Sequence, residues 1–212
     1  MLELGIKTLL AYLVGSVIGS LLLGRLRGVD IREQGSGNAG GTNALRTQGW
    51  RFALGVITLD VGKAILAVGL LPGVALPLVD LDAQVSREWL AVACAAAVVV
   101  GHVYPVWHEF RGGKGAATLV GAVAVLAPAA LLPVFAVWLC CVLLTGYVGL
   151  GTMLGTATLP VYFAVARAGD MALLSFGVLM TLFVAYTHRS NIERMRLGNE
   201  NRARRLWLLR PR

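Results

Sequence analysis

Charged side chains are scarce in this sequence. Asp, Glu, Lys and Arg make up 14% of its 212 residues, and hydrophobic residues make up 57%, whereas a soluble domain carries about 25% charged residues. A small globule with so few charges would expose much apolar surface to water. The composition therefore excludes a soluble enzyme, a disordered chain and a disulfide-stabilised scaffold.

Cysteine and histidine are also few, with three residues of each. Cys94, Cys140 and Cys141 lie in apolar runs, and no cluster of histidines accompanies them. Because a protein metal site needs several such ligands at short spacings, we expect no metal site and three buried, inert thiols.

Long apolar runs take up much of the chain instead. Residues 115–166 include no charged side chain, and a helix of about 20 residues crosses the roughly 30 Å of bilayer hydrocarbon. Runs that are apolar on every face favour helices over the alternating strands of a membrane barrel. We predict an all-α integral membrane protein, with spans near residues 3–24, 52–72, 88–108 and 171–188 and three more within 115–166.

Two interruptions divide the 115–166 run. Pro128 and Pro133 mark the first, and the glycines and threonines of residues 145–158 mark the second. The predicted total is seven transmembrane helices. Five spans are the alternative if residues 134–166 are re-entrant or lie partly in the interface. No repeat or linker is evident, so residues 1–212 are expected to form a single membrane domain.

The positions of Lys and Arg predict the orientation. In the seven-span arrangement, one side receives the cations of residues 25–51, residues 111–114 and the segment after Thr187, and the other receives Lys7, Arg87 and Arg167. Because Lys and Arg accumulate in cytoplasmic loops, the N-terminus is expected outside and the C-terminus in the cytoplasm. The net charge of +8 then reflects topology and attraction to anionic lipid, and we expect no nucleic-acid partner.

Two features of the first spans qualify this arrangement. Glu3 precedes the first apolar run and no small-residue cleavage site follows it, so we expect a retained span and not a cleaved signal. Asp60 and Lys63 lie one helical turn apart within the second span. Each charge alone would be costly in lipid, so we predict that they form a structural pair.

The first of three polar clusters covers residues 35–46, Gly-Ser-Gly-Asn-Ala-Gly-Gly-Thr-Asn-Ala-Leu-Arg. Glycines and short polar residues favour turns with exposed N–H groups, which wrap anions. We therefore expect a phosphate-binding loop and not a helix, in which Arg46 supplies a planar cation. The alternative is a solvated cytoplasmic turn in which Arg46 serves only to set the orientation in the membrane.

The second cluster ends one predicted span and begins the next. Its Gly112–Gly115 segment places Lys114 at the start of an apolar helix, where unpaired amides favour an anion. A nucleotide P-loop needs Gly six residues before its Lys and Ser or Thr after it, but His108 and Gly115 stand there, so we exclude ATP binding. Close packing of small residues is the alternative.

The third cluster follows the last predicted span. His188 and Asn191 would share a face on a continuing helix, and Glu200 lies beyond them. Each alone would be an interfacial side chain in contact with water, and the same is expected of His102 and His108.

In this order the clusters resemble the membrane-bound acyl-phosphate:glycerol-3-phosphate acyltransferase family of bacteria, the PlsY family. The matching residues are Gly28–Arg32, 35–46, Gly101–His102, Pro105, 110–118, His188–Asn191 and Gly198–Glu200, with Gly15–Ser16, Leu59–Asp60 and Lys63. The chain departs from the family at Thr145–Thr152, where Arg and Ser are often found, and Thr152 is the nearest hydroxyl.

The resemblance implies a seven-helix enzyme of the bacterial inner membrane. It would transfer a fatty acyl group from acyl phosphate to the 1-hydroxyl of sn-glycerol 3-phosphate, giving lysophosphatidic acid and inorganic phosphate, the first step of phospholipid biosynthesis. It implies no metal or nucleotide cofactor and an active site at the cytoplasmic face. It also implies contact with membrane lipid and functional coupling to the enzyme that produces acyl phosphate.

The family's site residues carry over by position. The implied catalytic residues are Ser36, Arg46, Lys114, His188 and Asn191. The implied substrate-binding residues are Gly37, Asn38, Thr42, Asn43, Gly112, Gly113, Gly115, Thr118 and Glu200. Because acyl phosphate already has a good leaving group, such a site must mainly hold two anions together. We expect His188 to bind phosphate and not to act as the base.

Two other functions stay open on the residues alone. A transporter of a phosphorylated solute would also use glycines, arginines and several spans, but it predicts polar residues at mid-membrane and an internal repeat. Only Asp60 and Lys63 meet the first condition. A thioester-using glycerolipid acyltransferase would pair His188 with an acid at the His-x4-acid spacing, and Glu193 stands where such enzymes carry Asp.

Overall fold

The computed structural model describes residues 1–77, 79, 81–204 and 206–209, and within them every regular element is a helix. The α-helices are α1 Leu2–Gly15, α2 Gly19–Arg27, α3 Gly41–Gln48, α4 Trp50–Leu70, α5 Arg87–Val103, α6 Ala116–Leu126, α7 Leu131–Thr145, α8 Val148–Ala166, α9 Met171–Thr187 and α10 Arg189–Arg196. Three 3₁₀ turns are η1 Ile31–Glu33, η2 Val106–His108 and η3 Pro128–Ala130. The contacts divide the chain into two compact units, Met1–Leu126 and Ala127–Arg212. The all-α prediction is confirmed for this part of the chain.

Five helical segments are long and apolar enough to cross a bilayer. They are Leu2–Arg27, Trp50–Leu70, Arg87–His108, Pro128–Thr145 and Val148–Ala166, and α9 with α10 makes a sixth if this pair, bent by 52°, is one span. Helix α6 is apolar but has 11 residues, which is about 16 Å of rise. Residues 115–166 form three helices with breaks at the predicted places, but of these α6 is too short to count among the candidate spans. A total of seven spans would need both α6 and the bent pair to cross.

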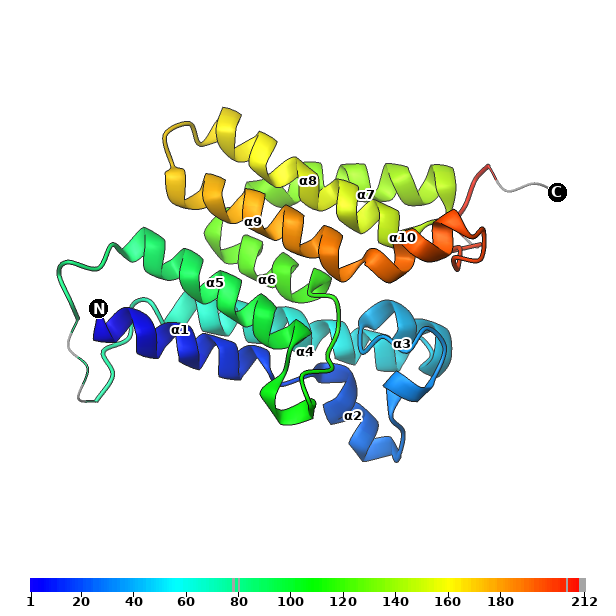
Figure 1. Ribbon diagram of the computed structural model, residues 1–212, viewed down its shortest axis with the longest axis horizontal. Coiled ribbons are helices and arrows are strands. Elements are labelled where there is room, and N and C mark those ends of the chain that lie inside the picture. The colour runs from blue at the N-terminus through cyan, green and yellow to red at the C-terminus, as the bar shows by residue number, and fades with distance from the viewer. Residues whose placement is uncertain (78, 80, 205, 210–212) are drawn as a thin grey trace. The chain divides into compact units, whose positions relative to one another are not determined.

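Glycines let the helices of the first unit approach closely. Helices α1 and α5 lie side by side (Figure 1), and added side chains at Gly15 or Gly101 would overlap the backbone of Val98 or Tyr12. Helix α4 contacts α2, α3, α5 and α6, and Gly121 of α6 meets its backbone in the same way. Small residues at contacts are how membrane helices pack, since lipid provides no hydrophobic drive between them.

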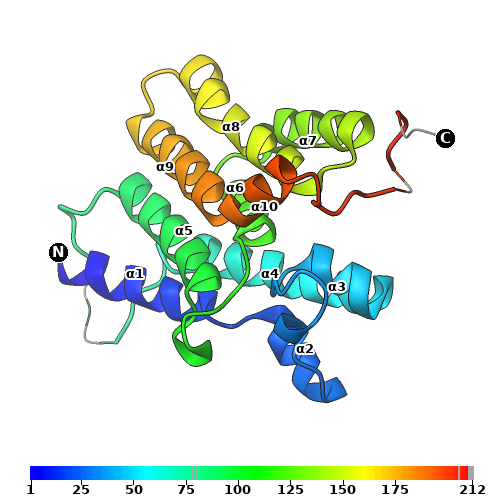
Figure 2. The same ribbon diagram turned by 45° about the vertical axis from the view of Figure 1, so that its right-hand side comes forward.

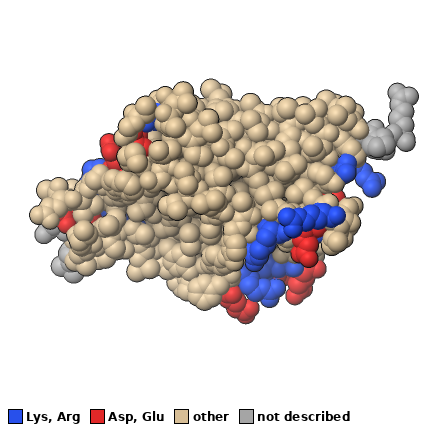
Figure 3. Space-filling view, turned by 45° about the horizontal axis from the view of Figure 1, so that its top comes forward, with Lys and Arg blue, Asp and Glu red and all other residues tan. Residues whose placement is uncertain are grey.

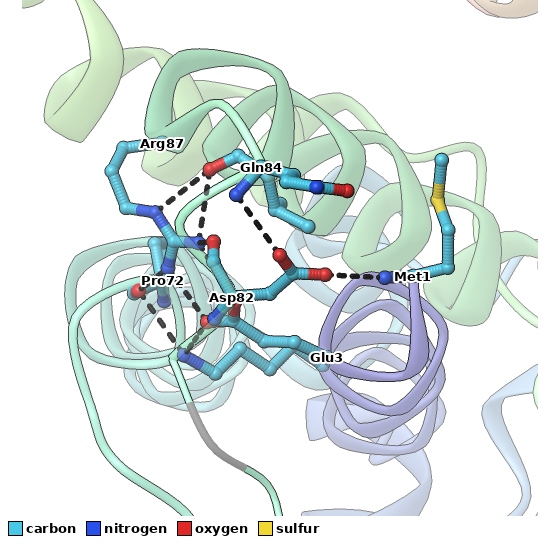
Figure 4. Close-up of polar contacts among 8 residues, drawn as sticks. Met1, Glu3, Pro72, Asp82, Gln84 and Arg87 are labelled. Atoms are coloured by element: carbon cyan, nitrogen blue, oxygen red, sulfur yellow. Dashed lines mark hydrogen bonds and ion pairs between the residues drawn. The ribbon is translucent and has the colours of Figure 1, made fainter.

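A charge cluster ties the start of α1 to the start of α5 (Figure 4). Buried Glu3 accepts hydrogen bonds from Lys7 Nζ at 2.7 Å and from two guanidinium nitrogens of Arg87 at 2.6 and 2.7 Å. Asp82 pairs with the amino group of Met1 at 2.6 Å, which holds the pKa of this carboxyl below its usual value. Lys7 is fully buried and Glu3, one turn away, neutralises it; it lies at the same end of the unit as Arg87, with which it was grouped.

A second buried cluster confirms the predicted pair in α4. Lys63 Nζ lies 3.0 Å from Asp60 Oδ1 and 2.9 Å from Nδ1 of His102, which is 2% exposed. Lys63 also donates to the Val17 carbonyl at 2.7 Å, and the Gly19 N–H donates to Asp60 Oδ1 at 3.2 Å. The expectation of an interfacial His102 was wrong, because the end of α5 packs against α4.

The second unit is built on α7, α8 and α9, which lie side by side in sequence order (Figure 2). Gly151 and Gly155 of α8 face backbone carbonyls of α7. The segment after α10 returns to the α7–α8 turn, where the Arg202 guanidinium lies over the rings of Tyr147 and Trp207 at 4.4 and 4.2 Å. Of the basic residues after Thr187, Arg205, Arg210 and Arg212 lie outside the described residues.

Uncharged residues cover most of the face drawn in Figure 3, and the charged ones gather in a few places. Large apolar side chains in the helices are widely exposed, as at Val165 (80%) and Leu182 (64%). Cys94 and Cys141 are buried as expected, but Cys140 is exposed. The expectation for Cys140 was wrong because it shares an exposed helical face with Leu144, one turn away.

Candidate active site

Asn43 organises the first predicted cluster from inside. Its side chain is 1% exposed, and Nδ2 donates to the carbonyls of Ile31 at 3.1 Å and Gln34 at 2.9 Å. Its Oδ1 accepts the N–H of Ser36 at 2.9 Å. Both amide hydrogens and the oxygen are thus engaged with backbone. Gly35, at φ +57° and against this amide, allows the loop to close around Asn43.

The second half of this cluster is helix α3, so the expectation of a continuous loop was wrong there. Gly41 packs against Ile57 of α4, and such packing outweighs the weak helix propensity of the segment. Thr42 and Arg46 are both exposed and lie one turn apart on α3. Arg46 forms no ion pair with any described residue, which makes its guanidinium available to an anion.

The Gly112–Gly115 segment of the second cluster folds back onto the end of α5. Gly112 donates its N–H to the Val103 carbonyl, and Gly113 donates to the His102 carbonyl, both at 3.1 Å. A Cβ on Gly112 or Gly113 would overlap His102. Helix α6 begins directly after this segment, at Ala116, as predicted. Lys114 therefore lies just before a helix N-terminus.

Thr118 lies in the first turn of α6. Its side chain is fully buried, and its hydroxyl has no hydrogen-bond partner among the described residues. A buried polar atom of this kind is uncommon in folded proteins and calls for a partner.

Arg32 links the two loops of the first unit. It is held by Asp30 at 2.7 Å, and its Nη1 donates to the carbonyls of His108 at 3.4 Å and Arg111 at 3.5 Å. The guanidinium holds the pKa of Asp30 below its usual value, and Asp30 raises the pKa of Arg32. The two hydrogen bonds to carbonyls connect the loop before α3 to the loop before α6, and the ion pair with Asp30 holds Arg32 in position for them.

His188 lies at the bend between α9 and α10. The helix axis turns by 52° at this residue, so the condition under which His188 and Asn191 would share one helical face is not met. The ring is 4% exposed, and Nδ1 is 2.8 Å from the Val184 carbonyl and 3.3 Å from the Thr187 hydroxyl. Since a carbonyl can only accept, Nδ1 carries a hydrogen. The charge of the ring then depends on whether Nε2 is protonated.

Glu200 holds the side chain of Asn191 in the second unit by a hydrogen bond. One carboxylate oxygen accepts from Asn191 Nδ2 at 2.8 Å, and the other accepts from Arg194 Nε at 2.6 Å. Gly149 of α8 lies against the same amide, since a Cβ there would be 2.9 Å from Asn191 Nδ2. Sequence reasoning missed Gly149, although the glycines of residues 145–158 signalled close packing.

Thr152 lies within α8, and its hydroxyl donates to the Val148 carbonyl at 2.9 Å. It is therefore bonded to its own helix. Among the described residues, no three His, Cys, Asp or Glu side chains are grouped so that they could hold a metal ion.

Comparison with known proteins places these features in a family. The sequence profile described as glycerol-3-phosphate acyltransferase matches residues 6–198. The chain belongs to the glycerol-3-phosphate acyltransferase family. This confirms the resemblance that the three clusters suggested.

Relatives cover nearly all of the chain. Proteins named glycerol-3-phosphate acyltransferase from Desulforamulus reducens and Chlorobaculum parvum are 41% identical over 192 residues and 36% identical over 218 residues. The matches cover 90% of both chains in the first case, and 91% of this chain and 93% of the relative in the second.

Two crystal structures of PlsY, an integral membrane glycerol 3-phosphate acyltransferase, are also similar. The glycerol 3-phosphate form has a TM-score of 0.79 at 33% identity, and the lysophosphatidic acid form has 0.77 at 32%, each covering 94% of both chains. With the apolar helices described above, this likeness shows that the chain is a multi-pass membrane protein.

The predicted site residues fall into both units of this acyltransferase-family protein. The first unit holds Ser36, Gly37, Asn38, Thr42, Asn43, Arg46, Gly112, Gly113, Lys114, Gly115 and Thr118, and the second holds His188, Asn191 and Glu200. Within the first unit, α3 and α6 both pack on α4, where Gly41 meets Ile57 and Gly121 meets Val61 one turn further along.

Proposed function

We propose that the protein transfers a fatty acyl group from acyl phosphate to the 1-hydroxyl of sn-glycerol 3-phosphate. The hydroxyl oxygen forms a bond to the acyl carbon, and the bond from that carbon to the phosphate oxygen breaks. The products are lysophosphatidic acid and inorganic phosphate, and the hydroxyl proton passes to a phosphate or to solvent. Family membership over residues 6–198 carries this proposal. The names of the PlsY crystal forms support the acceptor and the product.

Acyl phosphate as donor is supported by the chemistry of the site residues. A mixed anhydride needs little acid catalysis, but two phosphate-bearing substrates repel each other, so the site must supply cations and N–H donors. Arg46, exposed on α3, and Lys114, just before α6, are the cations that we assign to this role. Ser36, Asn38 and Thr42 add side-chain donors from the loop and from α3.

The glycines are assigned a shaping role. The N–H groups of Gly112 and Gly113 already bind carbonyls of α5, so we assign phosphate binding to the N–H groups at the start of α6, which have no partners within the helix. Gly37 and Gly115 have φ of +72° and +87°, which lets the backbone turn at both loops. Asn43 acts by holding the first loop in shape, and Thr118 offers its buried hydroxyl.

We also assign catalytic roles to His188 and Asn191 of the second unit, with Glu200 as the residue that positions Asn191. We assign phosphate binding to the protonated ring of His188, because Nδ1 is already bonded to the Val184 carbonyl. A general base would instead act only when deprotonated.

The number of membrane spans and their orientation are also part of the proposal. Seven spans follow if α6 and the α9–α10 pair both cross, and the distribution of Lys and Arg then puts the N-terminus outside. The site would lie at the cytoplasmic face of the bacterial inner membrane, in contact with membrane lipid and coupled to the enzyme that produces acyl phosphate. Residues 1–212 would act as one catalytic domain that comprises both units.

The test is a transfer assay with purified protein in lipid. Palmitoyl phosphate and glycerol 3-phosphate should give phosphate release matched by lysophosphatidic acid, in the presence of a metal chelator and without nucleotide. Palmitoyl-CoA should not replace palmitoyl phosphate. Uptake of glycerol 3-phosphate into vesicles without any transfer would contradict the proposal and favour a transporter.

A further inference from the structure

Three acceptors surround the ammonium of Lys63 in the first unit. Nζ lies 2.7 Å from the Val17 carbonyl, 3.0 Å from Asp60 Oδ1 and 2.9 Å from His102 Nδ1. An ammonium has three hydrogens to donate and cannot accept. Each hydrogen therefore has one partner, and His102 Nδ1 accepts one of them at 2.9 Å, closer than the 3.4 Å that separates Nδ1 from Asp60 Oδ1.

This acceptor role fixes the protonation of His102. A neutral imidazole has one donor and one acceptor nitrogen, so a lone pair on Nδ1 places the hydrogen on Nε2. A doubly protonated ring would bring a second cation to 2.9 Å from the Lys63 ammonium, with Asp60 as the only carboxylate in the cluster. Burial makes such repulsion severe, so the neutral ring with Nε2–H is favoured.

The Nε2 edge of His102 lies against the glycine loop before α6. A Cβ built on Gly113 would overlap the ring, with Nε2 as its nearest atom, and the Gly113 N–H is bonded to the carbonyl of His102 itself. Nε2 makes no hydrogen bond to any described residue, and it is not among the described polar atoms that are both fully buried and without a partner. The nitrogen therefore keeps a small exposed surface, at which an acceptor from outside the chain can reach it.

We propose that His102 Nε2–H donates to a phosphate oxygen bound at Lys114 and the first turn of α6. Lys114 follows Gly113 directly, and the helix N-terminus favours an anion at the same place. A neutral donor adds a directional bond without placing a further cation beside Lys63. Lys63 and Asp60 are then positioning residues that hold the ring in the Nε2–H form. The identity of the phosphate, from acyl phosphate or from glycerol 3-phosphate, rests on the proposed function.

Two replacements separate this role from a purely structural one. His102→Asn puts an amide near the Nδ1 position, where its oxygen still accepts from Lys63 but nothing donates toward the loop. His102→Gln puts a donor near the Nε2 position and removes the acceptor for Lys63. We expect His102→Asn to fold like the wild type and to raise KM for one substrate by about 10- to 100-fold, the range for a hydrogen bond to a charged group.

His102→Gln is the matched control. It should lose more thermal stability than His102→Asn but show the smaller rise in KM. A structural role predicts that both variants change stability alone, so unchanged KM for both substrates in folded His102→Asn protein would overturn the proposal. The substrate whose KM rises identifies the phosphate.

A spectroscopic readout does not depend on turnover. The sequence has three histidines, so ¹⁵N-labelled histidine gives few ring signals, and His102→Asn assigns the one of interest. We expect the Nε2–H tautomer, a shift of Nε2 on titration with inorganic phosphate, and loss of the fixed tautomer in Lys63→Met. An Nδ1–H tautomer, or no response to saturating phosphate, would refute the assignment.

The two readouts also distinguish this proposal from the proposed function. A wild-type protein that binds phosphate at His102 but transfers no acyl group would contradict the function and leave the phosphate site standing. An active enzyme whose His102 signal responds to neither substrate would contradict the site alone.

Discussion

Replacing Gly149 with Ala should reduce catalysis through Asn191. A Cβ at this position would lie 2.9 Å from Asn191 Nδ2, 3.0 Å from its Cγ and 3.2 Å from its Cβ, whereas ordinary contacts begin at 3.4 Å. Asn191 must then move by about 0.5 Å to restore a normal packing distance. It cannot turn aside freely, because Nδ2 is bonded to Glu200 at 2.8 Å.

The expected loss follows from that displacement. Misplacing a group by 1 Å can cost about 100-fold in rate, so a shift of half that size should lower kcat/KM by roughly tenfold, or about 1.4 kcal/mol. Overpacking lowers the free energy of unfolding by about 1–3 kcal/mol. The better helix propensity of Ala offsets roughly 0.5–1 kcal/mol of this loss. The Gly149→Ala protein should therefore remain folded but less active.

Gly151→Ala is the matched control on the same helix. Its Cβ would lie 3.0 Å from the Trp138 carbonyl of α7, so the overlap is similar but Asn191 is not touched. Phosphate release and thermal unfolding should be measured for both variants. We expect similar losses of Tm and a fall in kcat/KM for Gly149→Ala alone. Equal losses of kcat/KM would mean that α7–α8 packing matters, and wild-type kinetics of Gly149→Ala would refute the argument.

Three further predictions use the same assays. Lys114→Ala and Arg46→Ala should each lower kcat/KM by about 100-fold or more, roughly 3 kcal/mol of lost stabilisation, and the double variant should fall short of the product because the two cations act together. Lys114→Arg should stay impaired, since a planar guanidinium does not replace a compact ammonium between glycines; near-normal activity of folded Lys114→Ala would remove that residue from the mechanism. Asp60→Ala or Lys63→Ala should lower the yield of folded protein more than kcat, because each leaves a buried charge unpaired, and a stable but inactive Lys63→Ala protein would contradict the structural role. Glu193→Gln should keep full turnover with acyl phosphate, because this exposed carboxylate is not expected to act with His188; turnover with acyl-CoA that this substitution abolishes would support the thioester mechanism.

The sequence predicted the features that depend on local composition. Apolar runs located the helices, the prolines at 128 and 133 located a break between α6 and α7, and the spacing of Asp60 and Lys63 predicted their pairing. Each of these follows from neighbours within one or two helical turns. A buried charge that needs a partner and a proline that breaks a helix can both be recognised from such short segments.

Features that depend on distant partners were not predictable in this way. His102 looked interfacial because its contact with Lys63 arises only when α5 packs on α4. Residues 41–48 looked like a loop because their glycines are poor helix formers, yet contact with Ile57 makes them helical. The close approach of Gly149 to Asn191 likewise requires α8 and α10 to meet. Periodicity and propensity contain no information about such pairs.

The prolines at the α6–α7 break also decide how many hydrogen-bond donors the break leaves unpaired. Pro128 begins η3 and Pro133 lies in the first turn of α7, positions at which a backbone N–H has no partner within the helix. Proline has no N–H, so at these two positions there is no donor to satisfy. Residues 115–166 contain no charged side chain, so this break lies in an apolar segment, and an unpaired N–H costs several kcal/mol in hydrocarbon. A helix can therefore end and a new one begin at this break with two fewer unpaired N–H groups than if other residues stood at positions 128 and 133.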